Sequence, residues 1–282
     1  MNTIKIGWIG LGKMGVPMVQ NLLKVGYNVS VFNRSKQVLE LFKNQDVGIA
    51  NHPKELIDTC DVVILMVADD KATEVVFSGE NGLLSSSATN KIVINMSTVS
   101  AGISQKMTAV LVKNGNEYLD APVSGSLKQA TEGSLVIMVG GKEHVFEQVK
   151  PIFSHLGKLA LRVGDVGVGN SAKLAINALL SFHALGLAEA VVFAKDKGIE
   201  TSTLLELINN SALANPFMKI KGEAILQQNY DAVFALKHIV KDLTLAKDAG
   251  IDSPLANTAL KSFAEAQNKL GEEDIISIIK TL

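Results

Sequence analysis

A glycine-rich turn near the start of the chain constrains the fold more than any other feature. Gly10-Leu11-Gly12-Lys13-Met14-Gly15 has the pattern G-x-G-x-x-G; it follows the β-branched run Ile4–Ile9 and opens an amphipathic segment, Met14–Val25. In that context the glycines permit a tight turn, close approach of a pyrophosphate to the backbone, and close packing of helix on strand. The helix start also presents unpaired N–H groups to phosphate charge. The pattern predicts a Rossmann dinucleotide-binding unit; the alternative is a turn of the same shape that binds nothing.

Short β-branched runs alternate with amphipathic segments in the first part of the chain, which predicts a parallel sheet with helices on both faces. The candidate strands are Ile4–Ile9, Asn28–Phe32, Asp61–Val67, Ile92–Asn95, Glu117–Asp120, Leu135–Val139 and Leu159–Val163. After about Gly164 the apolar residues recur at helical spacing, without a strand signal. The candidate helices there are Gly169–Lys197, Thr201–Asn210, Phe217–Gln228, Phe234–Ala249, Pro254–Lys269 and Glu273–Lys280. We therefore predict an α/β protein: an N-terminal Rossmann domain, residues 1–164, and an all-helical C-terminal domain, residues 165–282, joined by a long helix that a flexible glycine-rich segment precedes.

The composition argues against several other classes of protein. The 282 residues have a formal net charge of -1, with Lys and Arg spread along the chain, so nothing favours nucleic acid as a partner. The only cysteine, Cys60, cannot form an internal disulfide, which is typical of a reducing compartment. The apolar stretch Leu174–Ala194 contains Asn177, His183 and Glu189, so a buried core helix fits it better than a membrane span. The start has no signal or transit pattern, and the histidines lack metal-ligand spacing. We expect a soluble cytoplasmic protein without a bound metal.

The second predicted strand bears on the choice of cofactor. In NAD-binding proteins an acidic residue usually ends this strand and accepts a hydrogen bond from the ribose 2′-hydroxyl. Here Val29–Phe32 leads into Asn33, Arg34 and Ser35, without a carboxylate. Arg34 can make a bidentate contact to a 2′-phosphate, with Asn33 and Ser35 as further donors. The sequence therefore favours NADP(H); the alternative is a solvated arginine on a surface loop.

Later strand ends supply further candidates for cofactor binding. Met66 and Val67 end the third predicted strand, and Ser97 and Thr98 follow the fourth. Ligands of open α/β sheets bind at the carboxyl ends of the strands, so we expect these four residues to contact the cofactor. For Ser97 and Thr98 the alternative is an N-cap pair for a helix that begins near Ile103.

Lys173 stands at the start of the long apolar helix and is the candidate proton donor. Burial disfavours the charged form of a lysine and brings its pKa closer to neutrality. Addition of hydride to a carbonyl produces an alkoxide, which an ammonium group can stabilise and protonate. Asn177 lies one turn later on the same face and could orient Lys173 or hold the substrate oxygen. On the helix pattern alone, a lysine that extends to water and an asparagine in a helix–helix hydrogen bond are the more common arrangement.

Ser124, Gly125 and Ser126 follow another predicted strand end, Glu117–Asp120. A turn of small residues can aim backbone N–H groups and hydroxyls at a carboxylate, which makes these three residues candidates for substrate binding. The alternative is a plain loop in which the serines stabilise the local turn.

Four separated motifs resemble those of the β-hydroxyacid dehydrogenase family, which includes 3-hydroxyisobutyrate dehydrogenases and tartronate semialdehyde reductases. The motifs are Gly10–Met18, Asp120–Ser126, Gly167–Asn177 and Lys241-Asp242-Leu243. The resemblance covers almost the whole chain, although Ser126 stands where the family usually has a second glycine and Ala101 where a proline is common. It implies an oxidoreductase with Lys173 as proton donor, a carboxylate-binding loop at Ser124, and Lys241 as a cofactor contact that Asp242 braces.

Two further stretches resemble the glyoxylate and succinic semialdehyde reductase branch, Ala214–Gly222 and Phe234–Asp242. The resemblance implies that Phe234 contacts NADPH and that the substrate is a small carboxylate-bearing carbonyl compound. It also implies a homodimer or a homotetramer. The alternatives are a 3-hydroxyisobutyrate dehydrogenase, a tartronate semialdehyde reductase, an imine reductase and, from another class, a non-catalytic NADP-binding assembly module.

Overall fold

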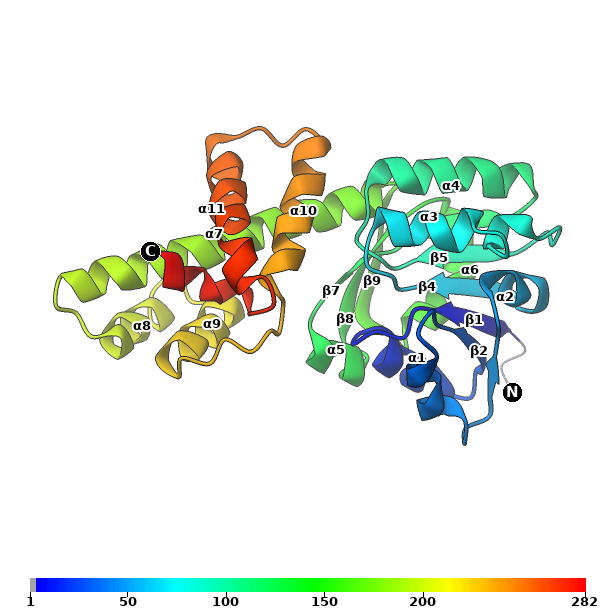
Figure 1. Ribbon diagram of the computed structural model, residues 1–282, viewed down its shortest axis with the longest axis horizontal. Coiled ribbons are helices and arrows are strands. Elements are labelled where there is room, and N and C mark those ends of the chain that lie inside the picture. The colour runs from blue at the N-terminus through cyan, green and yellow to red at the C-terminus, as the bar shows by residue number, and fades with distance from the viewer. Residues whose placement is uncertain (1–3) are drawn as a thin grey trace. The chain divides into compact units, whose positions relative to one another are not determined.

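The computed structural model describes residues 4–282. The chain divides into two compact units, Met1–Lys173 and Leu174–Leu282 (Figure 1). The division falls within the long helix α7, Val168–Asp196, and so lies later in the chain than the domain boundary at residue 164 that the sequence suggested. The first turns of α7 belong to the first unit because they are hydrogen-bonded to its sheet.

The first unit is built on a mixed sheet, with nine strands within residues 4–173. The strands are β1 (Lys5–Ile9), β2 (Asn28–Phe32), β3 (Val47–Ile49), β4 (Val62–Leu65), β5 (Ile92–Asn95), β6 (Glu117–Asp120), β7 (Val123–Ser124), β8 (Leu135–Gly140) and β9 (Gly157–Gly164). Their order is β3-β2-β1-β4-β5-β6-β8-β7, with β9 beside β8, and it contains the 3-2-1-4-5-6 order of dinucleotide-binding folds. Strands β1 to β6 pair in parallel as predicted, whereas β8 is antiparallel to β6 and β7. The prediction of an entirely parallel sheet was wrong at this edge.

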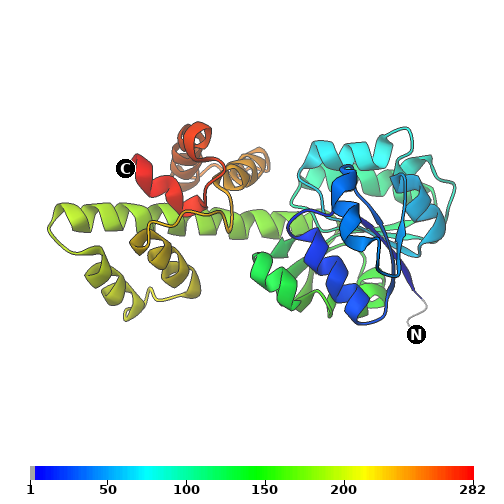
Figure 2. The same ribbon diagram turned by 60° about the horizontal axis from the view of Figure 1, so that its bottom comes forward.

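Helices cover both faces of the sheet, as the alternating pattern predicted (Figures 1 and 2). One core contains residues of α1 (Gly15–Lys24), α5 (Leu127–Glu132) and α6 (Glu143–Phe153); the other contains residues of α2 (Pro53–Thr59), α3 (Asp70–Ser78) and α4 (Ala101–Lys113). The side chains of the central strands alternate between these cores: Val62 and Ile64 join the first, and Val63 and Leu65 join the second. Burial on both faces explains why such a strand reads as an unbroken apolar run. Short 3-10 helices, η1 (Lys36–Phe42) and η2 (Leu83–Ser85), complete the unit.

The second unit is helical throughout, as predicted. After α7 come α8 (Thr201–Asn209), α9 (Pro216–Leu226), α10 (Leu236–Asp248), α11 (Pro254–Leu270) and a final 3-10 helix, η3 (Ile275–Thr281). By length and composition α7 could cross a membrane, but Leu185, Leu187 and Val191 are buried in the core of this unit. They pack there with Leu236 and Phe263, which makes α7 the core helix that the sequence predicted.

Candidate functional site

The glycine loop joins β1 to α1, and the three positions call for a glycine for different physical reasons. Gly10 has a φ of +99°, and a Cβ there would lie 2.1 Å from the Met66 carbonyl oxygen. A Cβ on Gly15 would lie 2.1 Å from the carbonyl oxygen of Gly10, which also accepts a 2.9 Å hydrogen bond from Trp8 Nε1. A Cβ on Gly12 would meet no atom within 4 Å, so packing does not require a glycine at this exposed position. Close approach of a pyrophosphate to the backbone does require one.

The side chain of Asn33 fixes this loop from the end of β2. Its Oδ1 accepts a hydrogen bond from the Leu11 N–H at 2.9 Å, and its Nδ2 donates to the Ser35 carbonyl oxygen at 2.9 Å. Arg34 and Ser35 are exposed beside it, and in the glycine loop Lys13 is also exposed. The amide of Asn33 is therefore engaged within the protein, and Arg34 is an exposed cationic side chain directly beside it.

The loop after β5 is held by side chains on both sides. Ser97 is buried; its Oγ accepts from the Val67 N–H at 2.8 Å, and its own N–H donates to Asn95 Oδ1 at 3.0 Å. Thr98 is half-buried in the middle of the loop. Ser100 caps α4, so the alternative interpretation of Ser97 and Thr98 as an N-cap pair was wrong. The arrangement brings Ser97 and Val67, two of the predicted cofactor contacts, together at neighbouring strand ends.

The turn after β7 separates two serines that look equivalent in the sequence. The Ser126 N–H and Oγ both donate to Gln129 Oε1, at 2.8 and 2.6 Å, at the start of α5. Ser124 is half-buried, and its hydroxyl makes no hydrogen bond to any residue that the structure describes. Gly125 between them has a φ of +142°, a conformation that favours glycine. Of the two hydroxyls, only that of Ser124 is free to bind a substrate.

Lys173 is 8% exposed and lies in the second turn of α7. The start of this helix is bound to Asp120, at the end of β6: the Gly167 and Asn170 N–H groups donate to its two carboxylate oxygens, each at 2.8 Å. Burial raises the pKa of Asp120, and the hydrogen bonds from Gly167 and Asn170 oppose that shift. Asn170 Oδ1 in turn accepts from the Val99 N–H at 2.9 Å. The segment before α7, predicted to be flexible, is instead anchored to the sheet.

The other predicted site residues, Asn177, Phe234 and Lys241, lie in the second unit. Asn177 is buried and its Nδ2 donates to Asp242 Oδ2 at 2.5 Å. Lys241 Nζ lies 2.9 Å from Asp242 Oδ1, so Asp242 braces Lys241 as the sequence suggested. Asp242 is 3% exposed and links the two, so it is the central polar group of this part of the helical unit.

A buried ion pair that the sequence analysis missed holds the segment containing Phe234. Lys221 Nζ donates to both carboxylate oxygens of Asp274, at 2.7 and 2.9 Å, and the two side chains are 7% and 3% exposed. The same carboxylate accepts hydrogen bonds from the backbone N–H groups of Val233, Phe234 and Ile276. No motif or spacing indicated this pair, because the segments meet only in the fold.

Two family models together match residues 5–282. The model described as the NAD binding domain of 6-phosphogluconate dehydrogenase matches residues 5–175, and that described as NAD-binding of NADP-dependent 3-hydroxyisobutyrate dehydrogenase matches residues 167–282. The chain belongs to the β-hydroxyacid dehydrogenase family. It is therefore an NAD(P)-dependent oxidoreductase, as the sequence motifs implied.

Curated relatives and solved structures agree with this assignment. Glyoxylate/succinic semialdehyde reductase 1 of Arabidopsis thaliana is 33% identical over 284 residues, which cover 99% of this chain and 98% of that protein. The 2-(hydroxymethyl)glutarate dehydrogenase of Eubacterium barkeri is 35% identical over 284 residues, covering 99% of this chain and 94% of that one. The structure of Mycobacterium tuberculosis 3-hydroxyisobutyrate dehydrogenase with L-serine has a TM-score of 0.91 at 26% identity, and the match covers 99% of this chain and 98% of that one.

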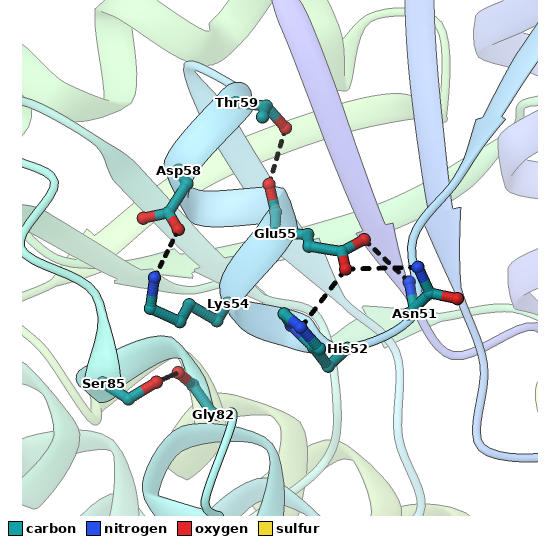
Figure 3. A network of polar contacts seen from close by, with 8 residues as sticks. All are labelled: Asn51, His52, Lys54, Glu55, Asp58, Thr59, Gly82 and Ser85. Atoms are coloured by element: carbon teal, nitrogen blue, oxygen red, sulfur yellow. Dashed lines mark hydrogen bonds and ion pairs between the residues drawn. The ribbon is translucent and has the colours of Figure 1, made fainter.

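Not every polar cluster in this family member belongs to the site. Around the start of α2, the Glu55 carboxylate accepts from the backbone and side-chain nitrogens of Asn51, at 2.8 and 3.2 Å, and lies 3.2 Å from His52 Nε2 (Figure 3). The Asn51 N–H lowers the pKa of Glu55. Lys54 pairs with Asp58 at 2.8 Å on the next turn. These contacts stabilise a helix end. Within residues 4–282 no three His, Cys, Asp or Glu side chains are grouped so as to hold a metal ion.

Proposed function

We propose that this protein is an NADPH-dependent reductase that converts small aldehyde or keto acids, such as glyoxylate and succinic semialdehyde, to the corresponding hydroxy acids. The observation that carries the proposal is the buried Lys173 in the second turn of α7, since the start of this helix is bound to Asp120 at the end of β6 and, through Asn170, to Val99 in the loop after β5. Ligands of this fold bind at those strand ends. The names of the relatives support a substrate of this class.

The residues of the first unit fit a nicotinamide dinucleotide. The exposed Gly12 and the start of α1 suit a pyrophosphate, and the exposed Arg34 suits a 2′-phosphate. The next acidic residue along the chain, Glu40, lies on η1 and is paired with Lys43 at 2.6 Å. When bound, the reduced nicotinamide supplies a hydride to the substrate carbonyl carbon.

The side chains then have distinct tasks. The Ser124 hydroxyl and the Gly125 N–H bind the substrate carboxylate and so fix the orientation of the carbonyl. The Lys173 ammonium stabilises the negative charge that develops on the carbonyl oxygen. It donates its proton to that oxygen, which leaves a neutral amine and a hydroxy acid, and the amine regains a proton from solvent before the next turnover.

A dehydrogenase that works in the opposite direction is the second candidate. The relative named as a dehydrogenase, at 35% identity, is as similar to this chain as the reductase at 33%. The same Lys173 would then accept the proton from a hydroxy acid such as 3-hydroxyisobutyrate. The preferred substrate and the direction of hydride transfer distinguish these two candidates from each other. Turnover of any kind distinguishes both of them from a non-catalytic NADP-binding module.

The first test mixes the purified protein with NADPH or NADH and follows loss of the reduced nicotinamide absorbance. The substrates are glyoxylate, succinic semialdehyde and tartronate semialdehyde, with 3-hydroxyisobutyrate and NADP+ for the reverse direction. We expect rapid oxidation of NADPH with the first two. Turnover only with tartronate semialdehyde or 3-hydroxyisobutyrate would overturn the choice of substrate, and binding of NADPH without turnover would support the non-catalytic module.

The role of Lys173 is tested in the same assay with Lys173→Ala. Loss of a positioned general acid lowers rates by roughly 10²–10⁴-fold. Lys106, a surface lysine paired with Glu74 at 2.5 Å, gives the matched control Lys106→Ala. We expect Lys173→Ala to bind NADPH normally and to lose turnover by this factor, while the control keeps it; equal rates in the two variants would refute the role.

Arg34→Ala tests the cofactor preference. A hydrogen bond to a charged group contributes about 1.5–3 kcal/mol, which corresponds to roughly 10–150-fold in affinity. We expect the dissociation constant for NADPH to rise by a factor in this range and that for NADH to stay unchanged. An equal rise in the dissociation constants of both cofactors would show that Arg34 does not contact the 2′-phosphate.

A further inference from the structure

The start of α7 is bound to the sheet by two side chains to which the sequence analysis gave no role. Asp120 is fully buried at the end of β6, and its carboxylate accepts hydrogen bonds from the N–H groups of Gly167 and Asn170. The Asn170 Nδ2 lies 3.4 Å from the Asp120 Oδ2 that its own N–H contacts. A carboxylate in this place also interacts favourably with the positive end of the helix dipole. Asp120 therefore fixes where the long helix begins.

Asn170 has a second contact, on a different strand end. Its Oδ1 accepts from the Val99 N–H at 2.9 Å, and both groups are buried. Val99 lies in the loop after β5, one residue after Thr98. Because Asn95 and Asp120 are partners in the parallel pairing of β5 with β6, one asparagine side chain joins the ends of two neighbouring strands to the same helix.

The start of α7 cannot easily move relative to β6 and β8, because its backbone packs directly on the backbone of these two strands. A Cβ added at Gly169 would lie 2.6 Å from the Met138 carbonyl oxygen and 2.8 Å from that of Asp120. A Cβ added at Gly140 would lie 2.8 Å from the Gly169 nitrogen. Lys173 follows Asn170 by three residues, so the two side chains lie on the same face of α7, one turn apart.

We propose that Asn170, fixed by Asp120, is a positioning residue that sets the place of the Lys173 ammonium relative to the loop carrying Ser97 and Thr98. The inference rests on the proposed function, since it concerns the geometry of proton donation. Ser100 holds the same loop independently, through hydrogen bonds to the Asp70 carboxylate at 2.8 and 2.5 Å. Because Ser100 and the start of α7 keep their other contacts, loss of the Asn170 contact should let the part of the loop between Asn95 and Ser100 shift relative to Lys173 without unfolding either element.

The decisive substitution is Asn170→Asp, which has nearly the same shape. It keeps an oxygen acceptor for the Val99 N–H but replaces the amide nitrogen facing Asp120 with a second carboxylate oxygen. Two buried like charges at this distance repel each other, so one side chain must move or take up a proton.

We expect Asn170→Asp to lower kcat by about 10²-fold, the effect of a displacement of about 1 Å at a reacting group, with the NADPH dissociation constant unchanged. The reaction with NADPH deuterated at C4 should show a larger isotope effect than in the wild type, because the chemical step has become slower.

The matched control is Asn116→Asp. Asn116 is another buried asparagine of the first unit: its Nδ2 donates to the Ala88 carbonyl oxygen and its Oδ1 accepts from the Lys91 N–H, each at 2.9 Å, before β6 begins. We expect this variant to lose thermal stability and to keep the wild-type kcat.

The outcomes distinguish this inference from the function on which it rests. If the wild type reduces none of the aldehyde acids, the proposed function fails and the inference fails with it. If the wild type is active and Lys173→Ala is not, but Asn170→Asp has the kcat of Asn116→Asp, then only the positioning role is overturned.

Discussion

Gly12 and Gly15 allow a sharp test of whether the glycine loop is built for a ligand or only for packing. The two residues belong to the same G-x-G-x-x-G pattern, but the structure surrounds them differently. A Cβ on Gly12 meets nothing within 4 Å, whereas a Cβ on Gly15 lies 2.1 Å from the backbone oxygen of Gly10 and 3.2 Å from Trp8 Nε1. Substitution by alanine should therefore separate binding from stability.

The magnitudes follow from those distances. For Gly12→Ala we expect no change in the free energy of unfolding, and loss of one close contact between phosphate and backbone, which lowers NADPH affinity by roughly 10–150-fold. For Gly15→Ala the clash is with backbone, and overpacking of this kind costs about 1–3 kcal/mol. A unit of this size loses roughly 2–4 °C in Tm per kcal/mol, so the Tm should fall by about 2–12 °C.

The assay is a thermal unfolding curve for each variant, with and without NADPH, together with a direct titration of the cofactor. Gly12→Ala should unfold like the wild type when NADPH is absent and should gain less stability when it is added. Gly15→Ala should unfold earlier under both conditions. If Gly12→Ala bound NADPH as tightly as the wild type, the interpretation of this loop as a pyrophosphate site would be refuted.

Two further pairs of substitutions test the substrate loop and the helical unit. Ser124→Ala should raise the KM for aldehyde acids by roughly 10–150-fold, because a charged hydrogen bond is lost, whereas Ser126→Ala, whose hydroxyl bonds to Gln129, should leave KM unchanged; the opposite order in steady-state kinetics would contradict the assignment. Asp274→Ala should lower the free energy of unfolding by about 3–5 kcal/mol, because it leaves Lys221 buried without its partner. Lys221→Met should cost less, since backbone N–H groups still serve the carboxylate, and equal losses in urea unfolding would refute this reasoning.

The sequence predicted those strands of the sheet that are buried on both faces. Val62–Leu65 and Ile92–Asn95 form continuous apolar runs because helices cover both of their sides, and both were predicted, the first within a slightly longer run. Val47–Ile49 and Val123–Ser124 escaped prediction because three and two residues are too short to show a period. The antiparallel direction of Leu135–Gly140 was also missed, since a hydrophobic pattern carries no information on strand direction.

The candidate site was predictable where its residues belong to local motifs. The glycine loop, the turn at Ser124 and Lys173 each stand in a short sequence motif, and the structure places them between β1 and α1, at the end of β7 and in the second turn of α7. Asp120 and Asn170 stand in two of these motifs, yet their contact joins positions 50 residues apart, and the contact of Asn170 with Val99 spans 71. Only the fold reveals such pairs. One signal was present: Asp120 directly follows the apolar pair Tyr118-Leu119 at the end of a predicted strand, where a buried carboxylate needs partners.

The residue that replaces the usual acid after β2 supports the choice of cofactor in a way that the sequence did not reveal. Asn33 is in the position where NAD-binding proteins place a carboxylate for the ribose hydroxyl. Here both ends of its amide are used within the protein, by the Leu11 N–H and by the Ser35 carbonyl oxygen, so Asn33 shapes the glycine loop and carries no charge. An aspartate could also accept from Leu11, but its negative charge would repel a 2′-phosphate placed beside Arg34. The neutral amide keeps the structural contact and removes that repulsion, so a phosphate beside Arg34 would meet positive charge without an opposing carboxylate at Asn33.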